Sequence, residues 1–190
     1  MSNSLVLWGI AALLLFWSVG AYNRLVRLRA DANSAYTALA LELTRQADLV
    51  HASLPASMIH TGLTQPGDLL DEVTELWAGL RAAATQLTIS LAAMRPRPLD
   101  PDAAATLSEA RDVLTNAWIR VSQEANDLAG SSIPEKLERQ WRELSSQSRA
   151  AAERFNNAVI RYNGAIRQFP ALLLAGLFAF KPARGIRAGN

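Results

Sequence analysis

The sequence predicts an all-α protein in which a single N-terminal transmembrane helix continues into an antiparallel up-and-down four-helix bundle. Three observations predict this fold: an uncharged opening stretch, four later segments with helical apolar spacing, and no segment with the alternation of a strand. Amphipathic helices with short connections bury their apolar faces against one another, which favours a bundle. Two helical hairpins that associate between chains would satisfy the same pattern and remain an alternative.

The opening stretch has the properties of a membrane anchor. The first 22 residues contain no charged side chain, and residues 5–22 form an apolar run of 18 residues. As a helix this run is about 27 Å long, just enough for a bilayer core of ~30 Å. Its tryptophan and tyrosine residues lie near its ends, where the water–lipid interfaces favour them. The predicted anchor residues are Leu5, Trp8, Leu14, Trp17 and Tyr22.

The charges on the two sides of the apolar run predict its orientation. Arg24, Arg27 and Arg29 follow the run directly, and no basic side chain precedes it. The positive-inside rule therefore places the N-terminus outside and the rest of this single-pass chain in the cytoplasm. A cleaved signal peptide is the main alternative, but it needs a basic segment before the apolar run and a small-x-small cleavage site, which residues 18–20 match only loosely.

The domain boundaries follow from the composition and from the helical periodicity. We expect an anchor over residues 1–22, a bundle domain over 23–168 and an apolar, then basic, tail over 169–190. The predicted bundle helices span about 23–54, 68–94, 101–129 and 133–168.

Local start and stop signals set the ends of these helices. Residues 52–67 hold two prolines and two glycines and are predicted to be a connection, after which Asp68 can cap the second helix. A proline-rich break precedes Asp100 and Pro101, which predict an N-cap and a first helical position. Residues 132–135 (SIPE) have the pattern of a capping box for the last helix.

The last predicted helix has the most regular apolar stripe, with alternating steps of four and three residues. Such a heptad is typical of coiled-coil packing at a shallow crossing angle and leaves self-association of the chain open. The stripe consists of Leu137, Trp141, Leu144, Ser148, Ala151, Phe155, Ala158, Tyr162, Ala165 and Phe169.

The sequence lacks the residue patterns that several classes of protein require for their function. The net charge is +2 with acids and bases interspersed, which argues against nucleic-acid binding, and there is no cysteine for thiolate chemistry. His51 and His60 lack the spacing of zinc ligands, and no histidine follows a glutamate by three residues, as a di-iron bundle site requires. No Gly-x-Ser-x-Gly motif is present. We therefore expect no metal, no cofactor and no enzymatic activity.

Two stretches resemble the LemA family. They are residues 22–29 (YNRLVRLR) and residues 155–170 (FNNAVIRYNGAIRQFP), the second of which continues into 175–181 (AGLFAFK). Residues 45–53 (RQADLVHAS) depart from the family pattern of a paired basic step followed by Asp-Leu-Ile-Pro-Asn-Leu, so the chain is identified as a divergent member.

The resemblance implies a single-pass bacterial inner-membrane protein with a cytoplasmic helical bundle. Some members of this family are implicated in membrane remodelling and others lie beside membrane proteases, and the family has no established enzymatic activity. We expect a non-catalytic scaffold, adaptor or membrane-organising factor, whose partners are the lipid bilayer and unidentified proteins. The alternative is an accessory subunit or regulator of a membrane protease in envelope-stress quality control.

Two Tyr-Asn pairs mark the ends of the first and last bundle helices. An antiparallel array brings these ends together at the membrane surface, where arginine side chains attract anionic headgroups. The pairs either pack between helices or form a site for a partner or headgroup. The candidates are Tyr22, Asn23, Arg24, Arg27, Arg29, Arg161, Tyr162, Asn163 and Arg167.

The tail begins with 12 uncharged residues, 169–180, followed by Lys181, Arg184 and Arg187. This run is too short to span a bilayer as a helix, and Pro170 separates it from the preceding helix. It either lies in the membrane interface or docks on the bundle, and both remain open. The interfacial candidates are Phe169, Leu173, Leu177, Phe178, Phe180 and Lys181.

Overall fold

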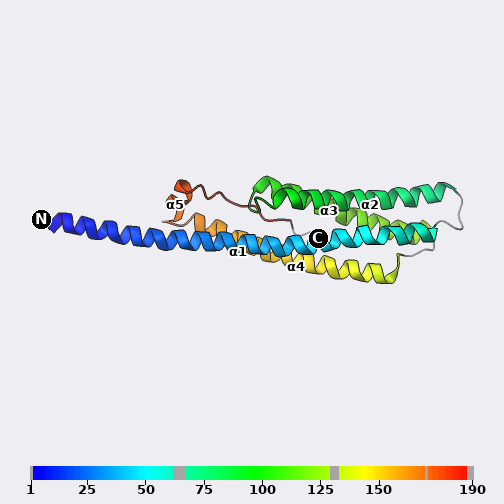
Figure 1. Ribbon diagram of the computed structural model, residues 1–190, viewed down its shortest axis with the longest axis horizontal. Helices are drawn as coiled ribbons and strands as arrows, with labels where there is room; N and C mark the ends of the chain where they lie inside the picture. Colours follow the sequence, from blue (N-terminus) through cyan, green and yellow to red (C-terminus); the bar gives the residue numbers. More distant parts are fainter. Residues whose placement is uncertain (1, 62–66, 129–132, 170, 188–190) are drawn as a thin grey trace.

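The structure, a computed structural model, is a long rod of helices (Figure 1). It describes residues 2–61, 67–128, 133–169 and 171–187, and the side chains of 6–9, 12–53, 74–124, 133–169 and 171–187. Within these residues the helices are α1 (Ser2–Thr61), α2 (Gly67–Met94), α3 (Pro101–Leu128), α4 (Glu135–Ile166) and α5 (Ala171–Leu177).

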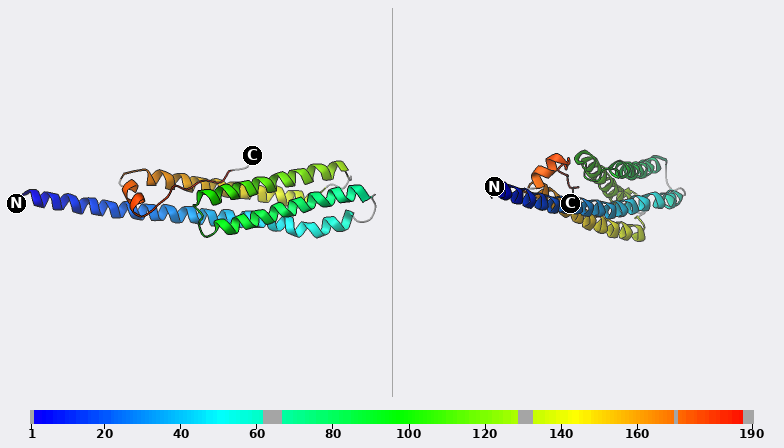
Figure 2. Two further views of the ribbon diagram at one scale, coloured as in Figure 1. Left: turned by 90° about the horizontal axis from the view of Figure 1, so that it is seen from above. Right: turned by 60° about the vertical axis from the view of Figure 1, so that its left-hand side comes forward.

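Helices α1 to α4 alternate in direction and form the predicted up-and-down bundle (Figures 1 and 2). The most extensive contacts join α1 to α4 and α2 to α3, and α1 also packs on α2. Over the described residues, the backbones of α3 and α4 make no close contact. Large side chains bridge them instead: the rings of Trp118 and Trp141 stack with centroids 4.3 Å apart. Farther along α4, a cavity lined by Ser108 of α3 and by Asn156 and Asn163 of α4 marks a groove between the two helices.

Helix α1 joins the apolar N-terminal segment to the core of the bundle without a break. Its 60 residues correspond to about 90 Å at 1.5 Å per residue. The described side chains between residues 6 and 17 are exposed, whereas a buried stripe begins at Leu25 and continues through Leu39 and Val50. In the described part of the chain, α1 is the helix that is long and apolar enough to cross a membrane. The predicted anchor and first bundle helix are thus one element.

The predicted end of the first bundle helix is wrong. The sequence predicts an end near residue 54 and a connection over 52–67, but α1 passes through Pro55 and ends at Thr61. A proline removes its own backbone donor and crowds the preceding turn, yet the residues after it can resume the helical hydrogen-bond pattern. Helix α2 begins at Gly67, so Asp68, whose side chain lies outside the described ones, stands inside the first turn.

The structure confirms one of the two predicted caps that it describes. The Asp100 carboxylate accepts the backbone N–H groups of Asp102 at 3.0 Å and Ala103 at 3.2 Å, and α3 begins at Pro101. The predicted capping box at 132–135 is misplaced: Pro134 occupies the N-cap of α4, with no side-chain cap, and Ser132 lies outside the described residues. The extended ψ of Pro134 (125°) delays the start of the helix to Glu135.

Replacing Asp100 by alanine should lower the free energy of unfolding by about 1 kcal/mol, because two helix-start amides lose their acceptor. Urea unfolding followed by circular dichroism measures this change. Asp102→Ala is the matched control: it removes a carboxylate from the same helix start without removing the cap, and a few tenths of a kcal/mol are expected. Equal losses in the two variants would contradict the assigned cap.

The stripe of α4 supplies the centre of the core. Phe155 is completely buried and meets the ring of Tyr36 edge-on, with centroids 6.1 Å apart, while the Tyr36 hydroxyl donates to the Leu91 carbonyl at 3.0 Å. The predicted seam thus joins α4, α1 and α2 at one level. It does not extend to Phe169, which is exposed because α4 ends at Ile166 and the chain turns.

Candidate functional site

The candidate site lies where the C-terminal residues return to the bundle at the end of the apolar segment. Helix α5 packs beside α1 and α4, and residues 178–187, here called the strap, run back along the bundle (Figures 1 and 2). Aromatic contacts place α5 at the level where the predicted membrane span ends. The ring of Trp17 lies 5.4 Å from that of Phe169, and the ring of Tyr22 lies 5.0 Å from that of Phe178.

Helix α5 turns small side chains inward and large apolar side chains outward. Ala171 and Ala175 are buried against the bundle. The outward set, here called the α5 patch, is between 52% and 76% exposed and contains no polar side chain. The α5 patch consists of Phe169, Leu172, Leu173, Leu177 and Phe178.

The chain changes character immediately after the α5 patch. Phe180 is only 8% exposed, with the guanidinium of Arg29 above its ring at 5.9 Å, whereas Lys181 is exposed. Of the two alternatives for the tail, docking on the bundle therefore describes the strap from Phe180 onward. The α5 patch remains open for an interface.

Two asparagines of α4 hold the strap by its backbone. The Asn163 amide donates to the Ala183 carbonyl at 2.8 Å and accepts the Ala183 N–H at 2.9 Å. Asn156 makes the same pair with Ile186, at 2.7 and 2.8 Å. Seven helical residues advance ~10.5 Å and three extended residues advance ~10 Å, so the two spacings match. Each asparagine side chain thus makes the two backbone hydrogen bonds that a neighbouring strand would otherwise make.

The shape of the strap is matched to these clamps. Ala183 and Ile186 are buried, and the Tyr162 hydroxyl donates to the Lys181 carbonyl at 3.0 Å. A Cβ atom added at Gly185 would lie 2.6 Å from the Asn156 Oδ1, closer than such atoms approach. Position 185 therefore requires glycine while Asn156 keeps its bidentate geometry.

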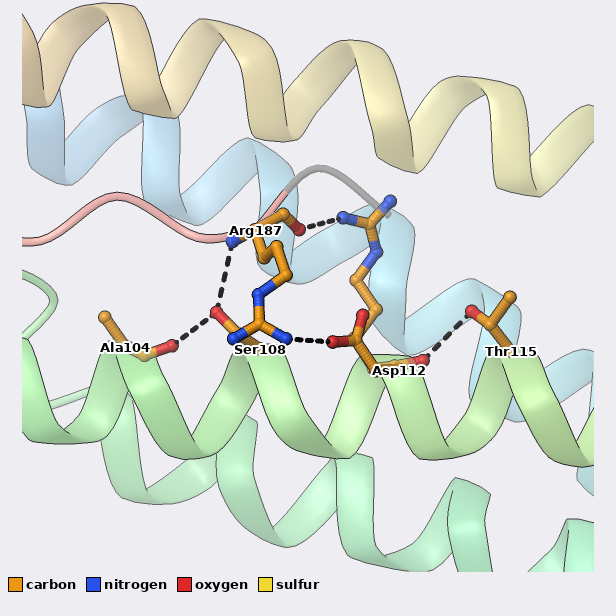
Figure 3. A network of polar contacts seen from close by, with 6 residues as sticks. Ala104, Ser108, Asp112, Thr115 and Arg187 are labelled. Carbon is orange, nitrogen blue, oxygen red and sulfur yellow. Dashed lines mark hydrogen bonds and ion pairs between the residues drawn. The ribbon is translucent and has the colours of Figure 1, made fainter. Parts of the chain in front are cut away.

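Helix α3 holds the strap from the other side of the groove (Figure 3). The Arg187 N–H donates to Ser108 Oγ at 3.2 Å, and the Arg187 carbonyl accepts from the Arg111 guanidinium at 2.8 Å. The Arg187 guanidinium pairs with Asp112 at 3.0 Å. Burial lowers the pKa of Arg111 and Arg149 lowers it further, while Asp112 opposes them. The strap thus fills the groove that α3 and α4 leave between them.

Comparison with models of protein families assigns most of this chain to one family. The family model described as the LemA family matches residues 55–189, which is more than half of the chain. The chain belongs to the LemA family. Comparisons with curated proteins and with solved structures gave no match. In this LemA family member, the matched region includes α2 to α5 and the strap, so the groove and its occupant belong to the family domain.

The structure places the predicted surface residues of this LemA protein in two groups. Tyr162 and Asn163 face the strap, so their contacts lie within the chain. The others lie on the outside of the rod, where the Arg24 guanidinium donates to Gln168 Oε1 at 3.3 Å. This outer group consists of Tyr22, Asn23, Arg24, Arg27, Arg29, Arg161 and Arg167. Of the predicted anchor residues, Trp8, Leu14 and Trp17 are exposed, and the Leu5 side chain lies outside the described ones.

The antiparallel fold brings together two parts of the sequence that lack acids. Residues 1–30 and 155–190 hold eight of the 19 basic residues and none of the 17 acidic residues. Residues 31–154 therefore carry 11 basic residues against 17 acidic ones. The end of the LemA bundle nearest the apolar segment is positive, and the rest of the bundle is negative.

The groove residues Asn156, Ser108, Arg111 and Gly185 are not among the candidates predicted from the sequence. The one available signal was the seven-residue spacing of Asn156 and Asn163, which puts two amides on one face of a helix beside the apolar stripe. Among the side chains that the structure describes, no three His, Cys, Asp or Glu residues gather as a metal site would. The expected absence of cofactors and of catalysis stays a prediction.

Alkaline pH should loosen the strap. Burial raises the pKa of Tyr162 above its usual 10.0, with Arg29 opposing the shift, because the neutral hydroxyl is the form held in the folded state. This contribution is complete below the usual tyrosine pKa and is lost as the pH rises through the raised pKa, since the unfolded chain ionises first. An environment-sensitive fluorophore on Arg187→Cys should report the release. Tyr162→Phe should remove this phase, and an unchanged profile in that variant would contradict the assignment.

Proposed function

We propose that this LemA family member is a non-catalytic scaffold or adaptor that stands upright on the cytoplasmic face of the bacterial inner membrane. The observation that carries the proposal is the contact between α5 and the end of the apolar segment of α1. It puts the outward α5 patch beside Trp17 and Tyr22, so two apolar elements end at one level.

Two apolar contacts with the membrane restrict the tilt of the rod more than a single contact does. A single membrane helix with a rigid extension can tilt, whereas α5 lies to one side of α1 and would have to leave the lipid for the rod to tilt away from it. Burying one large apolar side chain stabilises by roughly 1.5–3 kcal/mol, and the α5 patch has five of them. The exposed Arg24, Arg27 and Arg167 lie near this level, where each basic side chain gains ~1 kcal/mol at an anionic surface.

An upright rod presents its surfaces away from the bilayer. Helix α1 continues from Tyr22 to Thr61, which is about 58 Å at 1.5 Å per residue. Partners of the bundle would therefore be held at a set distance from the membrane. The acidic excess of residues 31–154 keeps this part of the rod from lying on anionic headgroups.

Fluorescence quenching by quenchers attached to lipids tests whether the α5 patch lies in the membrane. The chain contains no cysteine, so single cysteines at Leu173, Leu177 or Leu41 can carry a fluorophore in full-length protein reconstituted in bilayers. Brominated acyl chains should quench labels at the two α5 positions and not at Leu41, which is exposed farther along α1. Equal quenching at all three sites, or none on α5, would overturn the upright arrangement.

In-cell photo-crosslinking tests the adaptor role. A crosslinker placed singly at the exposed positions Leu41 of α1, Ile89 of α2 and Val113 of α3 should capture the same partner repeatedly from at least one of them. A membrane protease as the main product would favour the alternative role of a protease accessory. Protease added to spheroplasts tests the topology separately: digestion of the bundle would contradict a cytoplasmic location.

A further inference from the structure

The groove between α3 and α4 has the properties of a binding site for an extended peptide. The groove side chains Asn156, Asn163, Ser108, Arg111 and Tyr162 all bond to main-chain groups of the strap. Pairing of this kind gives an extended segment the hydrogen bonds that a neighbouring strand would otherwise supply. Affinity therefore comes from the backbone, and selectivity comes from the few positions where the strap is buried.

The buried positions define what the groove accepts. Position 183 is small, position 185 has no room for a Cβ atom, and position 186 is a buried aliphatic side chain. Pro182 and Arg184, by contrast, are exposed. The matching ligand is an extended segment with the pattern small-x-Gly-aliphatic. Every copy of this chain carries both the groove and that segment.

We propose that the groove also takes the strap of a second copy, so that neighbouring molecules exchange their C-terminal segments. The hydrogen bonds and the ion pair described for residues 183–187 go to α3 and α4, so a strap from another copy would make the same bonds. Exchange of identical elements is a low-cost route to association for this reason. A cavity of about 440 Å³ lies beside the strap between α3 and α4, so the groove is not closed over its occupant.

The connection to the strap is long enough for exchange. Residues 167–182 link α4 to the clamped part and, with α5 kept helical, can still extend to roughly 40 Å, against ~10 Å between the axes of packed helices. The ring contacts of Phe169 with Trp17 and of Phe178 with Tyr22 must open, while the α5 patch can remain at the lipid surface. Copies held in one membrane present their grooves at one height, which raises their effective concentration. This last step rests on the proposed membrane anchoring, whereas the groove contacts do not.

Disulfide capture in full-length chains tests the exchange. Two differently tagged chains, one with Ser108→Cys and one with Arg187→Cys, are co-expressed and oxidised in membranes. Because the chain has no cysteine of its own, a link between the two tags requires a strap in the groove of another copy. We expect about ten times more cross-linked product from this pair than from the control pair Arg139→Cys and Arg187→Cys. A tenfold difference corresponds to about 1.4 kcal/mol in favour of the docked strap. Arg139 lies exposed at the far end of α4.

The substitution Gly185→Val distinguishes exchange of straps from random encounters of the two cysteines, because under exchange its effect depends on which chain carries it. On the Arg187→Cys chain it should reduce the link about tenfold, since that strap no longer fits. On the Ser108→Cys chain it should increase the link, since that groove is vacated. Ala183→Leu should repeat this asymmetry, and Pro182→Ala should leave the link unchanged. The exchange would be overturned if the amount of cross-linked product equalled that of the Arg139→Cys control, or if it did not depend on which chain carries Gly185→Val. Neither outcome would affect the quenching test of the membrane contact of α5.

Discussion

Replacing Phe155 by alanine should lower the free energy of unfolding by about 3–5 kcal/mol. Its side chain is completely buried and lies against Tyr36, whose hydroxyl reaches the backbone of α2 at Leu91. Removing the ring would leave a cavity where α1, α2 and α4 meet, and the long helices on either side cannot close it without breaking the register of the stripe. Urea unfolding of the full chain in a mild detergent, followed by circular dichroism, measures the loss.

Ile160→Ala is the matched control for Phe155→Ala. It lies on the same helix and is 66% exposed, so its removal should change the stability by no more than about 0.5 kcal/mol. A loss in Phe155→Ala no larger than that of the control would contradict the assigned core.

Replacing both Asn156 and Asn163 by alanine should release the strap while leaving the four long helices folded. Four backbone hydrogen bonds disappear, which together should cost the docked strap about 2–4 kcal/mol. Trypsin can cut after Arg184, and in the native protein the clamped backbone on both sides of that bond protects it. We expect cleavage there to accelerate at least tenfold, as measured by mass spectrometry of the shortened chain.

The neighbouring Asn157→Ala serves as the control for this double variant. Asn157 lies on the exposed face of α4, so its replacement should leave the cleavage rate unchanged. Unchanged helicity in all three proteins is required for the interpretation. Protection of Arg184 in the double variant would mean that other contacts hold the strap, and the role given to the amides would be wrong.

The bundle could be predicted from the sequence because helical periodicity is a local property. The stripe of α4 and the Asp100 cap both depend on residues within one or two turns of each other. Predictions failed where a local signal competes with the rest of a helix. Pro55 does not end α1, and Pro134 takes the cap position that the pattern assigned to Ser132.

The tail shows why its sequence pattern alone could not distinguish the membrane interface from docking on the bundle. Its 12 uncharged residues are uniform in sequence, yet the α5 patch faces outward while Phe180 turns under Arg29. The division depends on Trp17, Tyr22 and Arg29 of α1, each more than 150 residues before the tail residue that it contacts. No spacing within the tail contains that information.

The bundle helices, the apolar N-terminal segment with arginines on one side, and the resemblance to the LemA family could all be recognised in the sequence alone. These features depend on composition and short-range periodicity. That α3 and α4 stand apart, that the strap lies between them, and that Gly185 and Asn156 depend on each other could be seen only in the folded chain. The spacing of Asn156 and Asn163 does not say which backbone the two amides hold, because the clamp forms only once segments 20 to 79 residues apart lie side by side.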